Sequence, residues 1–227
     1  MRAILFDAGA TLVHPDPPVE AIYSREFSAD GAWFAEEDLA RALTRAWEEV
    51  HANPASDRYG GVRGEAEFWQ AFLSRVRCLL DGGTLSAAAF ERLARHFRSA
   101  DAWAIYDDVV PTLEELARRG LRLAVVSNWD SHLPTLLAEL GLDRFFPVIA
   151  VSAIEEIGKP DPEIFLRACR RLDVEPAEAL HVGDSVSEDF EGARSAGLEA
   201  LLLDRRNACP EIEDRILTLA QIPGRLG

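Results

Sequence analysis

The chain has 227 residues, of which 48% are apolar, so it can bury a core and is too apolar to be intrinsically disordered. Its formal net charge is −15 at pH 7. A surface of this sign repels the phosphates of nucleic acids and of anionic membranes, so we expect neither of them as a partner.

The chain begins with a short apolar strand, Ala3–Phe6, which ends at Asp7. That run is too short for a signal peptide or a membrane span. No later stretch approaches about 18 uninterrupted apolar residues. We therefore expect a cytoplasmic protein.

Residues 15–102 have the periodicity of helices and contain no convincing strand. Apolar residues recur at helical spacing in three groups: Leu39, Leu43 and Trp47; Phe68, Phe72, Val76 and Leu80; and Phe90, Leu93 and Phe97. Between the first two groups, residues 53–64 are rich in Gly, Pro, Ser and Asp and predict a loop.

From about Val110 onward, strands and helices alternate. Strands are predicted over residues 121–126, 147–151, 179–182 and 198–203, with helices over 112–119, 133–140, from 161 onward and over 187–196. Asp161 and Pro162 combine the preferred N-cap carboxylate with the preferred first helical residue, and a left-handed cap is least costly at Gly141.

Strands separated by such helices predict right-handed crossovers and a parallel sheet. The fold class is therefore α/β, with a doubly wound, parallel, five-stranded Rossmann-like core. The core comprises residues 1–14 and 103–227, and residues 15–102 form an inserted helical cap.

Polar residues follow the strands at the edge where open parallel sheets bind ligands. They are Asp7, Ser127, Asn128, Ser152 and Asp184, which follows Gly183, with Lys159 shortly after the third strand. Lys159 is the sole lysine among 24 basic residues. Because all the other basic residues are arginines, the lysine at position 159 suggests a specific role for its side chain. The alternative is that Lys159 is a solvated surface residue.

The carboxylates at this edge have two interpretations each. Asp7 can act as a nucleophile or bind a metal, or it can cap its turn. Asp184 and Asp189 flank a helix start, where hard oxygen ligands suit Mg²⁺ but acids also gather because of the helix dipole. Ser127 and Asn128 can bind a phosphoryl oxygen through hydroxyl and backbone N–H, or form a simple turn.

Four segments in this order resemble the four motifs of the haloacid dehalogenase (HAD) superfamily. They are FDAGATL (6–12), VVSN (125–128), GKPDPEIF (158–165) and HVGDSVSED (181–189). The insert resembles the helical cap of the cap-bearing branch. Tyr59-Gly60 and Phe68-Trp69 are similar to its rhythmically expressed gene-product-like members.

The resemblance implies a hydrolase that acts on a small phosphorylated metabolite. Asp7 would be the nucleophile that forms an aspartyl-phosphate, and Ser127 and Asn128 would bind the transferring group. Lys159 would hold the nucleophile and the phosphoryl oxygens together.

The resemblance also implies Mg²⁺ as the cofactor. Asp7, Asp184 and the backbone carbonyl of Gly9 would ligate it, and Asp189 would do so directly or through water. One lysine and one Mg²⁺ supply three positive charges against the phosphate and the nucleophile.

The chain departs from the phosphatase pattern at Gly9, where such enzymes carry an Asp that serves as general acid and base. General acid–base catalysis contributes about 10²–10⁴-fold in rate, so poor leaving groups should be turned over slowly. A good leaving group, such as an acyl or aryl phosphate, avoids this loss. A proton donor from elsewhere would also do so, and His14 is the nearest titratable candidate in sequence.

Two alternatives stay open. A metal-independent 2-haloacid dehalogenase would not need Asp184 and Asp189, and a HAD-like binding protein would retain the fold without turnover. Phosphonate cleavage through a lysine Schiff base in the cap is excluded, because the cap contains no lysine. The sequence does not indicate the oligomeric state, and the candidate substrate contacts in the cap are His51, Tyr59, Arg63 and Trp69.

Overall fold

The computed structural model describes residues 1–51 and 61–226 and divides into two compact units. One unit comprises residues 1–14 and 105–227, and the other comprises residues 15–104. The second division lies two residues later than the sequence predicts. Two short strands that it did not predict, β2 (Val13–Pro15) and β3 (Trp103–Ile105), pair with each other where the chain passes between the units. Three residues are too few to show the alternation that identifies a strand.

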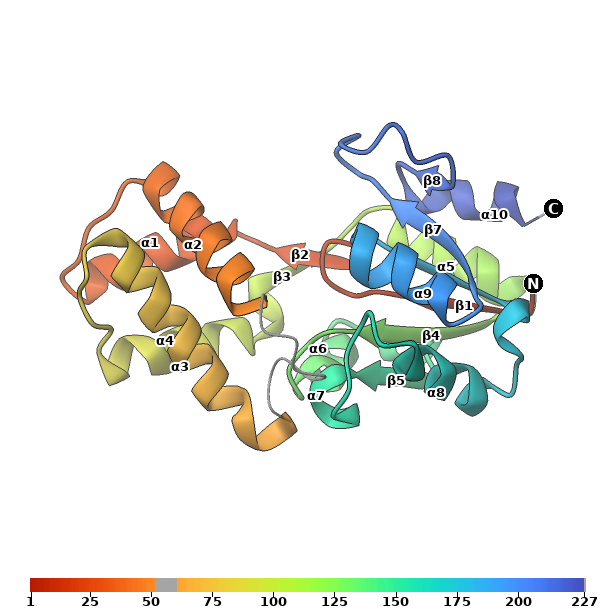
Figure 1. The fold of residues 1–227 in the computed structure, drawn as a ribbon, viewed down its shortest axis with the longest axis horizontal. Coiled ribbons are helices and arrows are strands. Elements are labelled where there is room, and N and C mark those ends of the chain that lie inside the picture. The colour runs from red at the N-terminus through yellow and green to blue at the C-terminus, as the bar shows by residue number, and fades with distance from the viewer. Residues whose placement is uncertain (52–60, 227) are drawn as a thin grey trace. The chain divides into compact units, whose positions relative to one another are not determined.

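The core unit contains one parallel sheet with helices around it (Figure 1). Its strands are β1 (Ala3–Phe6), β4 (Arg122–Ser127), β5 (Val148–Val151), β6 (Ala179–Gly183), β7 (Glu199–Leu203) and β8 (Arg215–Ile216). The first five confirm the predicted strands. The sixth, β8, corrects the predicted number: it has only two residues, which pair with the end of β7 at the edge of the sheet.

The strand order is β5-β4-β1-β6-β7-β8, so β1 lies between β4 and β6. Leu5 pairs with Ala124 on one side, and Phe6 pairs with Val182 on the other. The chain first winds outward from β1 through β4 to β5, and then in the opposite direction from β6 to β8. The carboxyl end of β1 is therefore the topological switch point, where such sheets bind ligands.

Every residue of β1 is fully buried, so both faces of the sheet are covered. The helices of this unit are α5 (Val109–Arg118), α6 (Leu133–Glu139), α7 (Ser152–Glu155), α8 (Pro162–Leu172), α9 (Gly192–Ser195) and α10 (Ile222–Arg225). Single 3₁₀ turns lie at η2 (Asp143–Phe145), η3 (Pro176–Glu178) and η5 (Leu219–Gln221). Leu5 belongs to the apolar cluster that also contains Phe165 of α8.

The residues predicted to begin and end these helices are confirmed at two positions. The Asp161 carboxylate accepts the backbone N–H of Glu163 and Pro162 is the first residue of α8, as the N-cap preferences require. Gly141 adopts a φ of +70° just after α6, a conformation that costs glycine least.

The helix predicted over residues 187–196 is divided into two parts. Residues Val186–Glu191 form a π-helical turn, η4, and α9 follows it. In η4 the Ser185 carbonyl accepts the N–H of both Asp189 and Phe190, so the turn is wider than an α-turn. The hydrophobic periodicity of the sequence does not reveal this π-helical turn, because the turn shifts the pattern of apolar residues by only one position.

The second unit contains α1 (Val19–Ala29), α2 (Glu36–His51), α3 (Gly61–Leu80), α4 (Ala87–Phe97) and the 3₁₀ turn η1 (Ala100–Ala102). Its helices bury one apolar cluster that includes Leu39, Phe72 and Leu93. The loop predicted over residues 53–64 is wrong from Gly61 onward, because α3 begins there; its other residues lie outside the described part of the chain.

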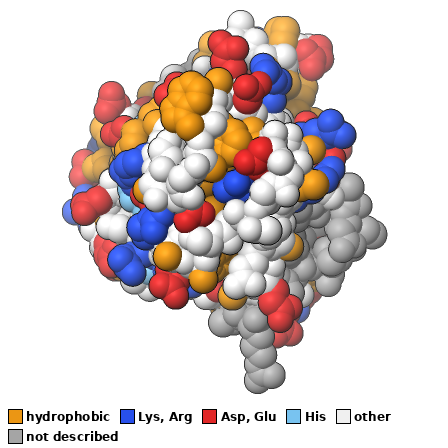
Figure 2. Space-filling view, turned by 90° about the vertical axis from the view of Figure 1, so that its left-hand side faces the viewer, with side chains coloured by type: hydrophobic (Ala, Val, Ile, Leu, Met, Phe, Trp, Pro, Cys, Tyr) orange, Lys and Arg blue, Asp and Glu red, His pale blue; other side chains and the backbone are white. Residues whose placement is uncertain are grey.

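The surface of this helical unit mixes charges of both signs with hydrophobic side chains (Figure 2). Among the residues that the structure describes, the large hydrophobic side chain with the highest exposure is that of Trp33, which is 78% accessible. Among the described residues, no helix is both long and apolar enough to cross a membrane.

Candidate active site

Three of the predicted residues meet at the carboxyl end of β1. Lys159 Nζ donates a hydrogen bond to Asp7 Oδ1 at 2.6 Å, and Ser127 Oγ donates to the same oxygen at 2.9 Å. The Lys159 side chain is 1% exposed, so it is not a solvated surface lysine. Because both donors reach one oxygen, they fix the orientation of the Asp7 carboxylate.

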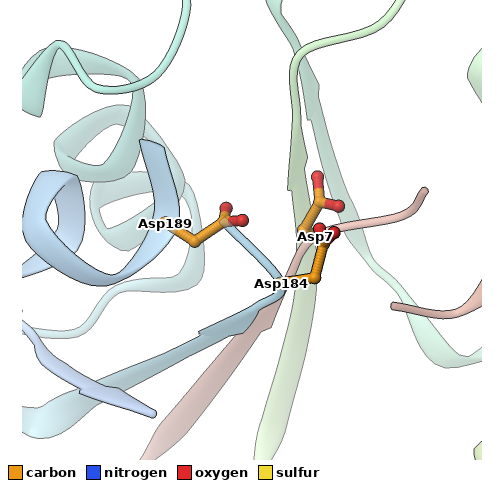
Figure 3. Close-up of side chains that lie close together, drawn as sticks. All are labelled: Asp7, Asp184 and Asp189. Carbon is orange, nitrogen blue, oxygen red and sulfur yellow. The ribbon is translucent and has the colours of Figure 1, made fainter. Parts of the chain in front are cut away.

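The other predicted carboxylates lie beside Asp7. Asp7, Asp184 and Asp189 each offer an oxygen within 4.8 Å of the others, and their side chains point toward a common space (Figure 3). Asp184 extends from the end of β6 and is exposed, whereas Asp7 and Asp189 are buried. Lys159 Nζ also donates to Asp189 Oδ1, at 2.5 Å, and so joins two of the three acids.

The electrostatics of the three acids differ in direction. Burial raises the pKa of Asp7 above its usual range, although Lys159 opposes the shift. Partial loss of hydration around its carboxyl group, with repulsion from Asp7 and Asp189, raises the pKa of Asp184 to about 7. Burial alone would also raise the pKa of Asp189, but Lys159 and His181 outweigh it and hold that pKa below its usual range. Asp7 and Asp184 are therefore the two acids whose ionised forms a cation would stabilise.

Asp189 is held by two further donors that the sequence analysis did not identify. His181 Nε2 lies 2.9 Å from Asp189 Oδ1, and the backbone N–H of Ser185 donates to Oδ2 at 3.0 Å. His181 is fully buried, and burial lowers its pKa despite the neighbouring carboxylate. A histidine inside the apolar strand β6 was the available signal. A Cβ at Gly183 would lie 2.2 Å from Asp189 Cγ, so only glycine permits this approach.

Asn128 fixes the loop that carries Lys159. Its Oδ1 accepts the backbone N–H of Lys159 at 2.7 Å, and its Nδ2 donates to the Lys159 carbonyl at 2.8 Å and to Glu188 Oε2 at 2.9 Å. The side-chain amide therefore positions the lysine, while the phosphate contact predicted for Asn128 involved its backbone N–H.

Gly9 lies in a tight loop two residues beyond Asp7. It bridges to Val13, and the residue that follows it, Ala10, has a φ of +53°. The nearest atom to a Cβ at position 9 would be Cζ3 of Trp129, at 3.1 Å. Trp129 was not identified from the sequence, because nothing local links the residue after Asn128 to the loop after Asp7.

The remaining candidates are placed as follows. The ring of His14 packs against Tyr106, with 4.5 Å between the ring centroids. In the helical unit, Trp69 stacks on Trp47 at 6.3 Å between centroids. Tyr59 and the side chains of His51 and Arg63 lie outside the described residues.

This arrangement of motifs matches a known family. Residues 1–197 match the sequence model of haloacid dehalogenase-like hydrolases. The chain belongs to this family. One relative is the haloacid dehalogenase-like hydrolase domain-containing protein 3 of Mus musculus, 32% identical over 209 residues that span 89% of this chain and 82% of the relative.

Two more relatives bear on the activity and the subfamily. The phosphoserine phosphatase of Thermus thermophilus is 31% identical over 222 residues, which span 90% of this chain and 89% of the relative. The rhythmically expressed gene 2 protein of Drosophila melanogaster is 24% identical over 218 residues, which span 91% and 84%. The predicted likeness to rhythmically expressed gene products is thereby confirmed.

Solved structures confirm the fold class. A HAD phosphatase from Thermococcus onnurineus is similar over 100% of this chain and 98% of its own, with a TM-score of 0.71 and 28% identity. A 2-haloacid dehalogenase from Pseudomonas syringae covers the same shares, with a TM-score of 0.64 and 26% identity. The family thus includes relatives of both reaction types.

Proposed function

We propose that this hydrolase is a Mg²⁺-dependent phosphatase of small phosphorylated metabolites that acts through an aspartyl-phosphate on Asp7. The observation that supports it most is the charge count at the switch point. Asp7, Asp184 and Asp189 carry three negative charges when ionised, and Lys159 supplies one positive charge. Such a site repels the multiply charged phosphate group of a substrate unless a divalent cation offsets the two remaining charges.

The residues present fit Mg²⁺, which prefers hard oxygen ligands and needs only one or two carboxylates. Asp7, Asp184 and the Gly9 carbonyl would hold it directly. Both oxygens of Asp189 already accept hydrogen bonds, so this residue would act directly or through water. When bound, Mg²⁺ polarises the phosphoryl oxygens and offsets the charge that develops on them.

The proposed reaction has two steps on Asp7. A carboxylate oxygen of Asp7 attacks phosphorus, the bond between phosphorus and the leaving oxygen breaks, and its electron pair departs with that oxygen. Water then attacks the phosphorus of the aspartyl-phosphate, which releases inorganic phosphate and restores the carboxylate. Ser127 and Lys159, which both donate to Asp7 Oδ1, would orient the nucleophile and bind the phosphoryl oxygens.

The test combines a metal chelator with removal of the nucleophile. The wild-type protein should hydrolyse 4-nitrophenyl phosphate or acetyl phosphate in the presence of Mg²⁺. EDTA should abolish this turnover, and Asp7→Asn should lower kcat by at least about 10³-fold, because the amide is a poor nucleophile. Asp173→Asn is the matched control, because the Asp173 side chain is 94% exposed. The activity of this variant should equal that of the wild type.

A second candidate is 2-haloacid dehalogenase chemistry, in which Asp7 would attack carbon. Gly9 favours it, because this chemistry needs no acid at that position, and so does the similarity to the Pseudomonas syringae enzyme. Chloride release from 2-chloropropionate that resists EDTA would identify this activity. Mg²⁺ binding without turnover of any of these substrates would instead indicate a binding protein.

A further inference from the structure

The indole of Trp129 occupies the space that a side chain at position 9 would need. A Cβ at Gly9 would lie 3.1 Å from Trp129 Cζ3 and 3.9 Å from Cε3 and Cη2. Carbon atoms in favourable contact are about 3.5–4.0 Å apart, so even one methyl group at position 9 would press on the ring. Glycine and indole are therefore complementary at this position.

The backbones on both sides are fixed. In the loop 8–13, three backbone hydrogen bonds of 2.8, 2.9 and 3.0 Å set the path of the chain around Gly9. The backbone N–H of Trp129 donates to Ser152 Oγ at 3.2 Å. The backbone carbonyl of Trp129 accepts hydrogen bonds from Ser152 Oγ and from the backbone N–H of Ala153, both at 3.3 Å. Ser152 is fully buried. The ring thus stands against the loop of the nucleophile as part of the scaffold.

The position is significant because Trp129 follows the two residues at the end of β4. Ser127 contacts the nucleophile and Asn128 holds the lysine loop, so the indole lies at the same edge of the sheet. An apolar ring therefore lies against position 9, where a proton-donating side chain would begin. A leaving oxygen on that side must depart as an anion and take its proton from solvent.

We propose that Trp129 is a specificity-determining residue that selects aryl phosphates over alkyl phosphates. This inference rests on the proposed function. In the first step the electron pair of the breaking P–O bond leaves on the aryl oxygen, which is stable as an aryloxide without a proton from the enzyme. The aryl ring gains contact with the indole, because aromatic pairs contribute about 0.5–1.5 kcal/mol beyond their buried area. An alkyl phosphate gains neither advantage.

The experiment compares wild type, Trp129→Ala, Gly9→Asp and the double variant Gly9→Asp/Trp129→Ala, all with Mg²⁺. The substrates are 4-nitrophenyl phosphate and glycerol phosphate, and the measured quantity is kcat/KM, which reports the step that expels the leaving group. The thermal midpoint of unfolding is measured for each variant in parallel. Trp33→Ala is the matched control, because Trp33 lies exposed on the helical unit.

Trp129→Ala should lower kcat/KM for the aryl ester by roughly 3- to 10-fold and leave the alkyl ester nearly unchanged. Gly9→Asp alone should lower Tm by roughly 2–10 °C without a gain on the alkyl ester, since its side chain presses on the ring. In the double variant the carboxyl has room, so most of that Tm loss should disappear. Its kcat/KM for glycerol phosphate should exceed that of Trp129→Ala by roughly 10- to 100-fold.

Two results would overturn the inference. One is a Gly9→Asp variant that keeps its Tm and gains alkyl activity alone, which would mean that the ring does not occupy the space. The other is an aryl-to-alkyl ratio that Trp129→Ala leaves unchanged. If wild type hydrolyses acetyl phosphate but neither ester, the proposed function stands and the aryl preference alone is overturned. If it hydrolyses none of the three substrates, the proposed function fails as well. The Tm values of the four proteins still show whether the Trp129 indole occupies the space that a side chain at position 9 would need.

Discussion

A methyl group at position 183 would overlap the carboxylate of Asp189. The Cβ of Gly183→Ala would lie 2.2 Å from Asp189 Cγ and 2.4 Å from Oδ2. To reach an ordinary contact of about 3.5 Å, the carboxylate must move by about 1.3 Å. Its hydrogen bonds to Lys159, His181 and Ser185 are 2.5, 2.9 and 3.0 Å long.

Such a shift away from β6 breaks at least two of these bonds, because none survives beyond about 3.5 Å. Each hydrogen bond to a charged group contributes about 1.5–3 kcal/mol, and disrupting a buried ion pair costs about 3–5 kcal/mol. We therefore expect Gly183→Ala to lower the free energy of unfolding by about 3–5 kcal/mol. Phosphatase activity should fall at least about 10²-fold, because a displacement of 1 Å at the site has that effect.

Urea unfolding and 4-nitrophenyl phosphate turnover measure the two effects. Gly224→Ala is the matched control, because no atom lies within 4 Å of a Cβ at that position. It should be neutral or slightly stabilising, since alanine favours helix over glycine. The reasoning is refuted if Gly183→Ala unfolds within about 0.5 kcal/mol of wild type and retains its activity.

The pKa values of Asp184 and Asp108 lead to three further predictions. Mg²⁺ affinity, measured by calorimetry, should rise about tenfold from pH 6 to pH 8, because Asp184 has a pKa of about 7 and binds metal when ionised; a pH-independent affinity would contradict its role as a ligand. In the metal-free protein the same group should make unfolding easier as the pH rises from about 4 to 7, since the unfolded chain has then lost the proton that the folded one retains. Asp108 accepts hydrogen bonds from Arg205, Thr218 and the N–H of Leu219, which outweigh burial and hold its pKa below 3.8. Asp108→Asn should therefore lower the free energy of unfolding by about 2–4 kcal/mol at pH 7, and the contribution of Asp108 should disappear as the pH falls from about 4 through its folded pKa. Equal urea midpoints at pH 7 would rule out this account.

Much of the fold could be read from the chain. Buried strands such as β1 and β6 are short apolar runs, and helix ends are marked by residues such as Asp161 and Gly141. These signals are local, because capping, backbone conformation and side-chain periodicity involve neighbours within about four residues. Elements of two or three residues, such as β2 and β8, are too short to produce such a pattern.

The residues of the site were also recognisable, because they follow the strands of a parallel sheet. Asp7, Ser127, Lys159, Asp184 and Asp189 all lie at the edge where the sequence predicted them. Their roles in binding Mg²⁺ and phosphate stay predictions, which chelation and substitution can test.

Only the tertiary structure decided which atoms meet. That Lys159 and Ser127 both reach Asp7 and that Trp129 lies against Gly9 depends on β1 lying between β4 and β6. Strand order is a property of the packed sheet and leaves no periodic trace along the chain. Contacts between residues more than a hundred positions apart therefore emerge only when the core closes around them.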